Sequence, residues 1–417
     1  MTQFNHKDIV IIGGGSAGVS AAISAAQTGL NVVLIERNSY LGGKATAAEV
    51  GTICGLYTFS KNEISEYIAE GFLKYFAVEL KILSNSQPLH NSMGMHYLPY
   101  DIEAYKKLCA NLLKKHKVDL LLNTSIKNVT VKNNIIESIT IVNDSMIKVI
   151  KCSSIVDCSG DSVISQLANL PLIKSDNYQA AAQVFTMKNI DFVTEEVLGM
   201  ILIKEIKKGI DSGKLASYYD RLYVVQGSIK NNNVSFKIGI PIEVNYQESN
   251  IKEIQTMAQV MIHTLVDFFL NHIPIFKNAS LHHIAQEVGF RVGIRSVGKY
   301  LLTEEDIMTC KKTSTAIANG AWPIEEWGQN KRVHMRYFNH DDFYQIPADC
   351  LISNNIPNLF FAGRIISATD AAIASARVMG ICIQTGYAAG KLAVGYHFKN
   401  NLSETIRGIQ KDLKLNN

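Results

Sequence analysis

Three glycines near the N-terminus constrain the fold of this chain more than any other feature. They form the motif Gly13-x-Gly15-x-x-Gly18, which follows the apolar run 8–12 and precedes a run of small residues with helical character. A second apolar run, 31–35, comes next. A strand, a glycine turn, a helix and a second strand within about thirty residues predict a βαβ unit of a parallel sheet.

Each glycine has its own part in binding a dinucleotide at such a turn. Gly13 permits the tight turn, Gly15 lets the backbone approach a pyrophosphate, and Gly18 allows close packing of helix on strand. The helix N-terminus offers free N–H groups to the phosphates. Glu36 ends the second strand, where an acidic side chain can accept hydrogen bonds from ribose hydroxyls. The motif predicts a dinucleotide site without separating FAD from NAD.

A second glycine turn follows the second strand and favours FAD. In the segment Gly42-Gly43-Lys44-Ala45-Thr46, the glycine doublet lets the chain fold back over a second phosphate or the ribityl chain. Together with Glu36-Arg37, this segment resembles the FAD-dependent oxidoreductases of the glutathione-reductase-like superfamily.

Three later stretches strengthen the resemblance. The stretch 155–161 resembles the strand and turn beside the nucleotide in that family, and 298–306 is similar to a motif of a narrower bacterial group. Within 344–380, the resemblance implies that Gly363-Arg364 lies by the phosphates and ribityl chain. It also implies that the turn 377–380 opens a helix whose N-terminus faces the flavin. A helix N-terminus stabilises the negative charge that reduced flavin gathers.

The expected cofactor is therefore FAD, and the fold class is α/β. The residues expected to bind FAD are Gly13, Gly15, Ser16, Ala17, Gly18, Glu36, Arg37, Gly42, Gly43, Lys44, Ala45, Thr46, Ile126, Ser159, Gly160, Gly363, Arg364, Val378, Met379 and Gly380. The fold expected is a doubly wound parallel sheet, a Rossmann-like FAD-binding domain, with an inserted mixed α+β substrate domain. The FAD-binding domain is assigned to 1–55, 101–170 and 345–417, and the substrate region to 56–100 and 171–344.

Two arginines are candidates for binding substrate. Where the family usually reads Gly-x-Arg-Glu-Ser-Arg-Arg-x-x-Gly, this chain keeps Arg291 and Arg295 but has Val292-Gly293-Ile294 between them. Two guanidinium groups four residues apart could clamp a carboxylate. An equally good interpretation is that the two arginines form structural pairs with other residues across a domain interface.

A few other side chains are candidates for the substrate face of the flavin. His96 and Tyr97 could supply acid–base chemistry or orient an oxygen, as could His90 and Tyr344. Cys54 stands alone, whereas the disulfide reductases of the superfamily need a CxxxxC pair near this point. A structural thiol is therefore the better interpretation of Cys54.

Composition narrows the classes of partner. The net charge of +4 is small for 417 residues, and no basic block with aromatic residues suggests nucleic acid. The seven cysteines form no CxxC pair and no His pair has zinc-ligand spacing, so we expect no metal and reduced thiols in a cytoplasmic protein. The apolar stretch 371–396 contains charged residues and many small ones, which predicts a buried helix rather than a membrane span.

The sequence predicts hydride transfer between flavin N5 and a small organic substrate, with an anion favoured. Oxygen or another carrier would exchange electrons with the flavin, and a homo-oligomer is left open. One alternative is a monooxygenase that uses NAD(P)H, although no second GxGxxG motif is present. Another is a flavin-binding module with decayed catalysis, which the altered stretch 292–294 keeps open.

Overall fold

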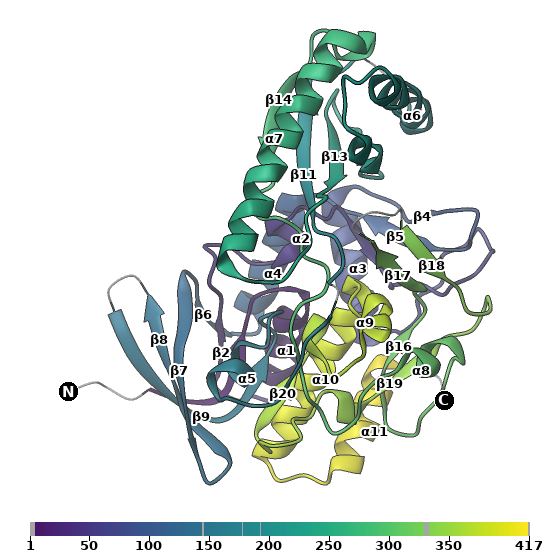
Figure 1. Cartoon of the computed structure of the whole chain (residues 1–417). Coiled ribbons are helices and arrows are strands. Elements are labelled where there is room, and N and C mark those ends of the chain that lie inside the picture. The colour runs from purple at the N-terminus through teal and green to yellow at the C-terminus, as the bar shows by residue number, and fades with distance from the viewer. Residues whose placement is uncertain (1–4, 144–145, 177, 192, 329–332, 416–417) are drawn as a thin grey trace.

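The computed structural model describes residues 5–143, 146–176, 178–191, 193–328 and 333–415. Its elements form a lower body, which contains both ends of the described chain, and an upper lobe (Figure 1). The lower body is built around a mainly parallel sheet, and the upper lobe around an antiparallel one. The expected α/β fold class is thereby confirmed.

The parallel part of the main sheet carries its strands in the order β6, β2, β1, β9, β20. Their bounds are β1 (Asn5–Ile12), β2 (Val32–Ile35), β6 (Asp119–Leu121), β9 (Met146–Asp157) and β20 (Leu359–Phe361). The first part of β9 also pairs antiparallel with β8 (Ile135–Asn143), which in turn pairs with β7 (Thr124–Lys132). Segments from both ends of the chain therefore meet in one sheet, as expected for a nucleotide-binding body interrupted in sequence.

Alternate residues of the parallel strands point to two different cores. Ile9 and Ile11 of β1 pack toward the helices α1 (Ser16–Ala26) and α10 (Met379–His397), while Val10 and Ile12 pack under β7, β8 and α5. This alternation follows from the period of two along a strand. Helices thus cover one face of the sheet. The antiparallel ribbon and the short helix α5 (Val163–Leu167) cover the other.

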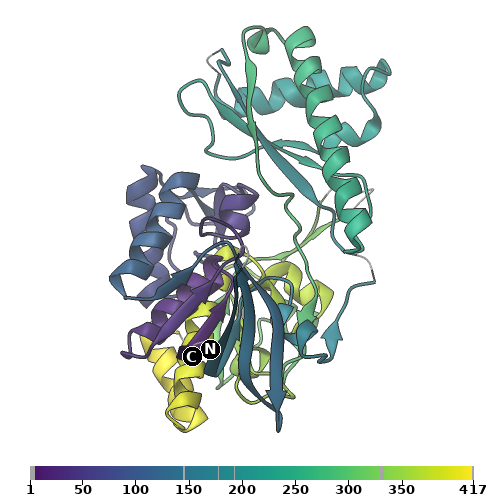
Figure 2. The same cartoon turned by 90° about the vertical axis from the view of Figure 1, so that its left-hand side faces the viewer.

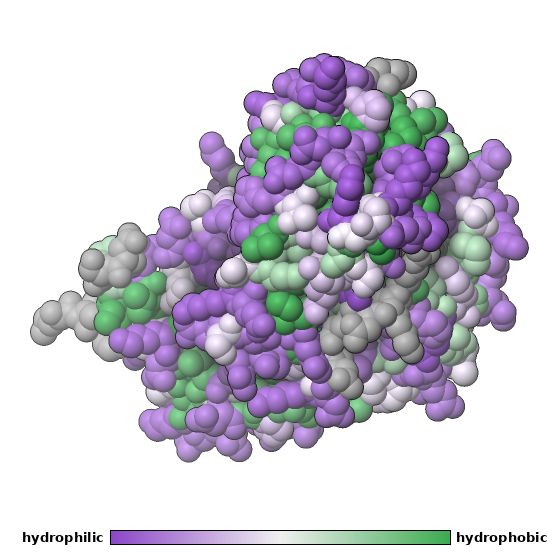
Figure 3. Space-filling view, turned by 45° about the horizontal axis from the view of Figure 1, so that its top comes forward, coloured by the Kyte–Doolittle hydropathy of each residue, from purple (hydrophilic) through white to green (hydrophobic). Residues whose placement is uncertain are grey.

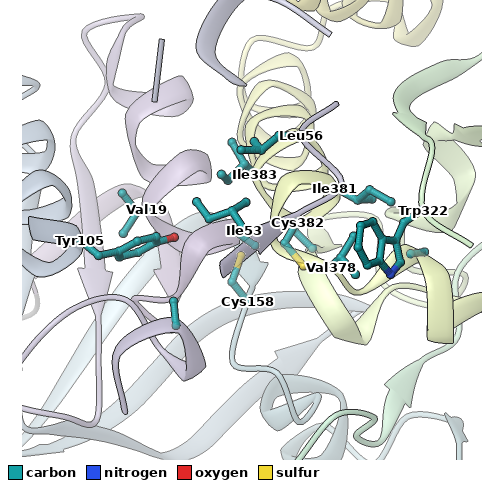
Figure 4. Packing of buried hydrophobic residues seen from close by; sticks show 14 of the residues in the cluster. Val19, Ile53, Leu56, Tyr105, Cys158, Trp322, Val378, Ile381, Cys382 and Ile383 are labelled. Atoms are coloured by element: carbon teal, nitrogen blue, oxygen red, sulfur yellow. The ribbon is translucent and has the colours of Figure 1, made fainter. Parts of the chain in front are cut away.

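Helices α1 and α10 approach each other very closely. A Cβ added at Gly386 would overlap the backbone of Ala17, and Ser20 donates a hydrogen bond to the Ile383 carbonyl at 2.6 Å. Buried side chains of both helices, among them Val19 and Ile383, pack in one core (Figure 4). The small residues of the stretch 371–396 therefore form a buried helical pair, α9 (Asp370–Ala376) and α10. In the part of the chain that the structure describes, no helix has the length and apolar content needed to span a membrane.

The remaining elements of the lower body surround this core. Helix α3 packs against α4, α10 and α11. The small sheets are β3-β5-β4, β10-β15, β16-β19 and β17-β18. The bounds of the elements are α2 (Lys44–Ala47), β3 (Thr52–Cys54), α3 (Gly71–Ser84), β4 (Leu89–His90), β5 (His96–Pro99), α4 (Ile102–Lys115), β10 (Leu172–Ile173), β15 (Arg295–Ser296), α8 (Glu304–Met308), β16 (Ala316–Gly320), β17 (Ile324–Trp327), β18 (Val333–Arg336), β19 (Tyr344–Pro347) and α11 (Leu402–Leu413).

The upper lobe (residues 182–284) is a four-stranded antiparallel sheet in the order β12-β13-β11-β14. The long helix α7 runs along the sheet (Figure 2). Helix α6 and the 3-10 helix η1 pack together beside β12 and β13. The bounds are β11 (Ala182–Lys188), α6 (Glu195–Asp211), η1 (Ser217–Arg221), β12 (Leu222–Val224), β13 (Val234–Gly239), α7 (Glu248–His272) and β14 (Ser280–Ile284). The exact domain boundaries stay a prediction.

Candidate functional site

One cavity begins at the carboxyl ends of the parallel strands and continues to β11 and β13 of the upper lobe. It is lined by these residues that the sequence predicts for the cofactor: Gly13, Gly15, Ser16, Ala17, Glu36, Arg37, Gly42, Gly43, Lys44, Ala45, Ser159, Gly160, Gly363, Arg364, Val378 and Met379. The carboxyl ends of parallel strands are where α/β folds bind nucleotides. The cavity is therefore the candidate site.

The fingerprint turn has the geometry that a phosphate-binding turn needs. Gly13 has φ +95°, and a Cβ there would lie 2.5 Å from the carbonyl oxygen of Cys158. Gly15 caps α1 without any side-chain hydrogen bond, so the first-turn N–H groups remain available to an anion. Gly18 lies outside the cavity lining, and a Cβ on it would overlap the Gly13 carbonyl. Gly18 thus serves the close packing of α1 on β1.

The second glycine turn lies directly against the first. The Gly42 N–H donates to the Gly14 carbonyl at 2.8 Å, and Gly43 has φ +54°. Thr46 points away from the cavity and donates to the Leu41 carbonyl at 2.8 Å, which closes the turn. The two glycine turns in contact together line the cavity with backbone and no side chains, which suits a pyrophosphate.

Glu36 stands at the end of β2, where the sequence predicts a ribose ligand. Its two carboxylate oxygens accept hydrogen bonds from the N–H groups of Gly14 at 2.6 Å and Asn38 at 2.8 Å. Burial raises the pKa of this carboxyl, and the two backbone donors oppose that rise. Each carboxylate oxygen keeps a lone pair for a further donor.

A charged group flanks this end of the cavity. Lys44 Nζ lies 2.6 Å from Glu287 Oε2, and Arg37 lies 3.3 Å from the same carboxylate. Burial by itself would raise the pKa of Glu287, but Lys44 and Arg37 hold it below its usual value. The two cations and one anion leave a positive charge beside the site.

Arg364 lines the cavity and joins its own segment to two others through hydrogen bonds. Its guanidinium donates to the carbonyls of Gly160 at 2.7 Å and Phe290 at 2.6 Å, and to Asp161 Oδ1 at 3.0 Å. Helix α10 begins after Val378 with no side-chain cap, and both Val378 and Met379 line the cavity. Gly380 packs on the Gly55 backbone rather than lining the cavity.

The end of the cavity under the upper lobe carries a cluster of charged side chains that the sequence analysis largely missed. Arg291 and Arg377 line it together with Lys237 of β13, Glu325 of β17 and Cys54 of β3. The cluster has three cations and one carboxylate. Lys237 could have been suspected as the one charge on the alternating strand β13. No sequence pattern indicates the position of Glu325.

Two indole rings hold this cluster in place. The Nε1 groups of Trp322 and Trp327 donate to Glu325 at 2.9 and 2.6 Å. The Trp327 ring also lies 4.2 Å from the Arg291 guanidinium and 4.8 Å from Lys237 Nζ, both measured to the ring centroid. These are cation–π distances. Trp327 therefore links the single anion to two of the cations.

Burial sets the protonation of the cluster. It lowers the pKa of Lys237 to about 8, with the nearby charge of Arg291 as the second cause. It raises the pKa of Cys54 to about 12, so this thiol stays protonated at neutral pH. Burial would also raise the pKa of Glu325, but Arg377 and the indole donors hold it below its usual value.

Several candidate residues are not among those that line this cavity. Arg295 is fully buried in an ion pair with Asp370, and the segment that joins it to Arg291 forms no helix and bends at Val292. His96 is bonded to Ser65 and to the Ser60 carbonyl. Tyr344 is buried and bonded to Ser375.

Two further candidates lie outside this cavity. Ile126 is in β7, on the face of the sheet opposite the helices, because β7 belongs to the covering ribbon. Tyr97 lines a second cavity, which His90 also lines. Among the five predicted catalytic residues, Arg291 is the one that lines the candidate site within the described part of the chain.

Comparisons with known proteins agree with the geometry of this site. The family model described as FAD dependent oxidoreductase matches residues 8–413. Mitochondrial dihydrolipoyl dehydrogenase of Dictyostelium discoideum is 27% identical over 171 residues, which are 41% of this chain and 32% of that protein. The 4,4'-diaponeurosporene oxygenase of Staphylococcus aureus (strain USA300) is 38% identical over 77 residues, 15% of this chain and 16% of that protein. These matches cover a third or less of each relative.

Solved structures share the fold over nearly the whole chain. A geranylgeranyl bacteriochlorophyll reductase-like protein from Thermoplasma acidophilum has a TM-score of 0.50 at 14% identity, covering 98% of this chain and 83% of that one. A flavin-dependent brominase variant has a TM-score of 0.50 at 12% identity, covering 97% and 84%. At such identity these likenesses concern the fold alone. The family match over residues 8–413 and the two facing glycine turns together establish that this chain belongs to the FAD-dependent oxidoreductase family and that its cofactor is FAD.

Proposed function

We propose that this oxidoreductase transfers a hydride between FAD and a small organic substrate that carries a negative charge. The observation that carries the proposal is the charge cluster under the upper lobe. Lys237, Arg291 and Arg377 face one end of the cavity there, against the single carboxylate of Glu325. An excess of cations in a half-buried pocket favours an anionic ligand.

Glu325 does not neutralise the whole cluster. Its oxygens already accept from two indoles, and Arg377 donates to its backbone carbonyl at 3.3 Å. Arg291 donates to the Ala180 carbonyl and stacks on Trp327, which fixes the plane of its guanidinium. A fixed guanidinium can take a carboxylate or phosphate through two parallel hydrogen bonds.

The cluster also adjoins the elements that the family resemblance assigns to the flavin ring. Arg377 directly precedes Val378 and Met379, where α10 begins. FAD, when bound, supplies a ring that accepts or donates a hydride. Lys237 can exchange a proton near neutral pH, because burial lowers its pKa to about 8. The apolar walls of Val50, Val184 and Ala182 limit the water around the substrate.

Anaerobic bleaching of the bound flavin tests the proposal. The holoenzyme is mixed with a panel of small hydroxy and amino carboxylates, and with the methyl ester or amide of each. We expect one or more carboxylates to bleach the flavin at least tenfold faster than their neutral counterparts. Equal rates for acid and ester would overturn the anion assignment. Rapid bleaching by NAD(P)H with no response to any carboxylate would favour a monooxygenase instead.

A further inference from the structure

A second cavity of about 1060 Å³ lies next to the first. It is bounded by α6, η1 and β12 of the upper lobe and by β4 and β5 of the lower body. Its walls are largely apolar, and residues such as Leu89, Leu202, Ile206 and Leu222 line it. A concave apolar surface of this size suits an organic molecule or part of one.

Two cross-strand pairs separate the two cavities. Cys54 is paired with Tyr97 between β3 and β5, and Lys237 is paired with Tyr223 between β13 and β12. In each pair one residue lines the first cavity and the tyrosine lines the second. Directly paired residues point to the same face of a sheet. The second cavity therefore adjoins the substrate end of the first, with two tyrosines between them.

Contacts of the tyrosine rings confirm how thin this wall is. The Tyr223 ring lies 5.6 Å from that of Trp327 and 5.8 Å from Lys237 Nζ. Burial raises the pKa of Tyr97 to about 12, and Glu195 of the second cavity is the second cause. A molecule that reaches from one cavity to the other must pass these two rings.

The two cavities have opposite charge. Glu195, Glu196, Asp211 and Asp220 line the second cavity, and its cation, Lys207, is paired with Asp211 at 3.0 Å. The facing end of the first cavity has three cations and one carboxylate. An elongated anion would be bound with its charged end toward Lys237 and Arg291, because the acidic cavity repels that end.

Apolar surface is left exposed at the second cavity. Ile203 on α6 lines it and is 74% exposed, and Leu89 of β4 is 38% exposed. Hydrophobic side chains also lie open among hydrophilic ones on the face of the upper lobe (Figure 3). Exposed apolar surface that borders a cavity marks a binding site for apolar groups.

We propose that the second cavity binds the apolar arm of an amphipathic substrate, whose anionic head lies at Lys237 and Arg291. The assignment of the head rests on the function proposed above, whereas the assignment of the arm rests on the second cavity. The substrate class is a carboxylate or phosphate joined to an extended, uncharged aliphatic or aromatic portion. A dianion with a charge at each end would be rejected by the acidic side chains.

The binding of simple carboxylates to the holoenzyme tests whether the second cavity holds an apolar arm, and it requires no catalytic turnover. Butyrate, decanoate and decanol are titrated while the absorbance spectrum of the bound flavin is recorded. Each buried methylene adds about 0.8 kcal/mol, or roughly fourfold in affinity. We expect decanoate to bind at least 30-fold more tightly than butyrate. Equal affinity for both carboxylates would overturn the second cavity as an arm site and leave the anion site standing.

Variants on one helix localise the effect. Ile203→Asp adds a charge inside the second cavity, and Met200→Asp is the matched control, because Met200 is 63% exposed on the same helix but does not line the cavity. We expect Ile203→Asp to weaken decanoate at least tenfold and to leave butyrate unchanged, with no effect of Met200→Asp. Equal loss in both variants would overturn the proposal.

A third variant separates the two assignments. Arg291→Gln should weaken butyrate and decanoate by the same factor and leave decanol unchanged, since it removes only the contact to the anionic head. If Arg291→Gln changes neither carboxylate while Ile203→Asp still weakens decanoate, the anion site fails and the apolar site stands.

Discussion

Gly15 and Gly43, which belong to different turns, are in close backbone contact. A Cβ added at Gly43 would be 2.9 Å from the Cα of Gly15, whereas a Cβ added at Gly15 would be 3.7 Å from the Cα of Gly43. The first distance is a clash and the second an ordinary contact. Gly43 is also held at φ +54°, while Gly15 has φ −74° and ψ −175°, which any residue adopts.

This asymmetry makes Gly15→Val a clean test of the cofactor site. The backbone angles and the space around Gly15 admit a Cβ, and Gly15 lines the cavity where the pyrophosphate is expected, so we expect the valine side chain to occupy that position. We expect a folded protein without flavin, with the melting temperature of the apoprotein unchanged. Flavin content is measured by heat release and chromatography.

Gly408→Val is the matched control, because Gly408 has open space around it on α11. It should keep its flavin. Normal flavin content in Gly15→Val would show that this turn serves the fold and does not approach the cofactor.

Cys54→Ser should leave flavin content and the rate of flavin reduction within about twofold of wild type. Burial raises the pKa of the Cys54 thiol to about 12, so it lacks the thiolate that redox chemistry requires. All seven cysteines are free, so Cys54 has no disulfide partner. Rapid-reaction spectroscopy measures the rate, and a loss of tenfold or more would assign Cys54 a direct part in the reaction.

The cofactor end of the site was predictable because its signals are local. Gly13, Gly15 and Gly43 each stand in a short turn between a strand and the helix that follows it in sequence. Where a turn requires a particular residue such as glycine, that residue indicates the backbone conformation of the turn. The parallel pairing of β1 with β2 follows from the same βαβ unit, since α1 joins the two strands.

The substrate end was not predictable in this way. Lys237, Glu325 and Arg377 come from three distant elements and meet because the upper lobe packs over the main sheet. Arg291 and Arg295 show the converse. Residues four apart share one face of a helix, but the segment that joins these two arginines forms no helix and bends at Val292, and only Arg291 lines the cavity.

Arg291→Lys should therefore change substrate binding, whereas Arg295→Lys should change stability. Lysine at 291 lacks the planar guanidinium that stacks on Trp327 and that can donate two parallel hydrogen bonds to an anion. A lost charge-assisted hydrogen bond costs about 1.5–3 kcal/mol, so KM should rise roughly 10- to 100-fold with flavin content intact.

Lysine at 295 replaces a fully buried guanidinium that is paired with Asp370 and bonded to Ser175. We expect Arg295→Lys to lower the melting temperature and to leave KM within about twofold. KM and the melting temperature, measured for both variants, show which arginine binds substrate and which is structural. Loss of flavin or of folding in Arg291→Lys would make that residue structural, and a raised KM in Arg295→Lys with normal stability would return it to the substrate site.

The affinity for an anionic ligand should fall as the pH rises through about 8, because Lys237 is the titrating member of the cluster. Its pKa is lowered to about 8 by burial first and by Arg291 second. Below this pH the ammonium is charged and attracts the anion. Above it the amine is neutral and the attraction is lost, whereas an ordinary lysine would keep its charge to about pH 10.

Lys237 is the first of the named cations to lose its charge. Glu325 has a pKa below its usual value, and the Cys54 thiol titrates at about 12. Burial first and Arg377 second lower the pKa of Arg291 to about 9, so its charge is lost only after that of Lys237. The dissociation constant of butyrate, measured on the holoenzyme from about pH 6 to about pH 9, should therefore begin to rise near pH 8. Lys237→Arg supplies a guanidinium, which holds its proton to higher pH than an amine, and should move this step to higher pH while keeping the affinity at low pH. A step of the same size and midpoint in Lys237→Arg would show that another group controls anion binding.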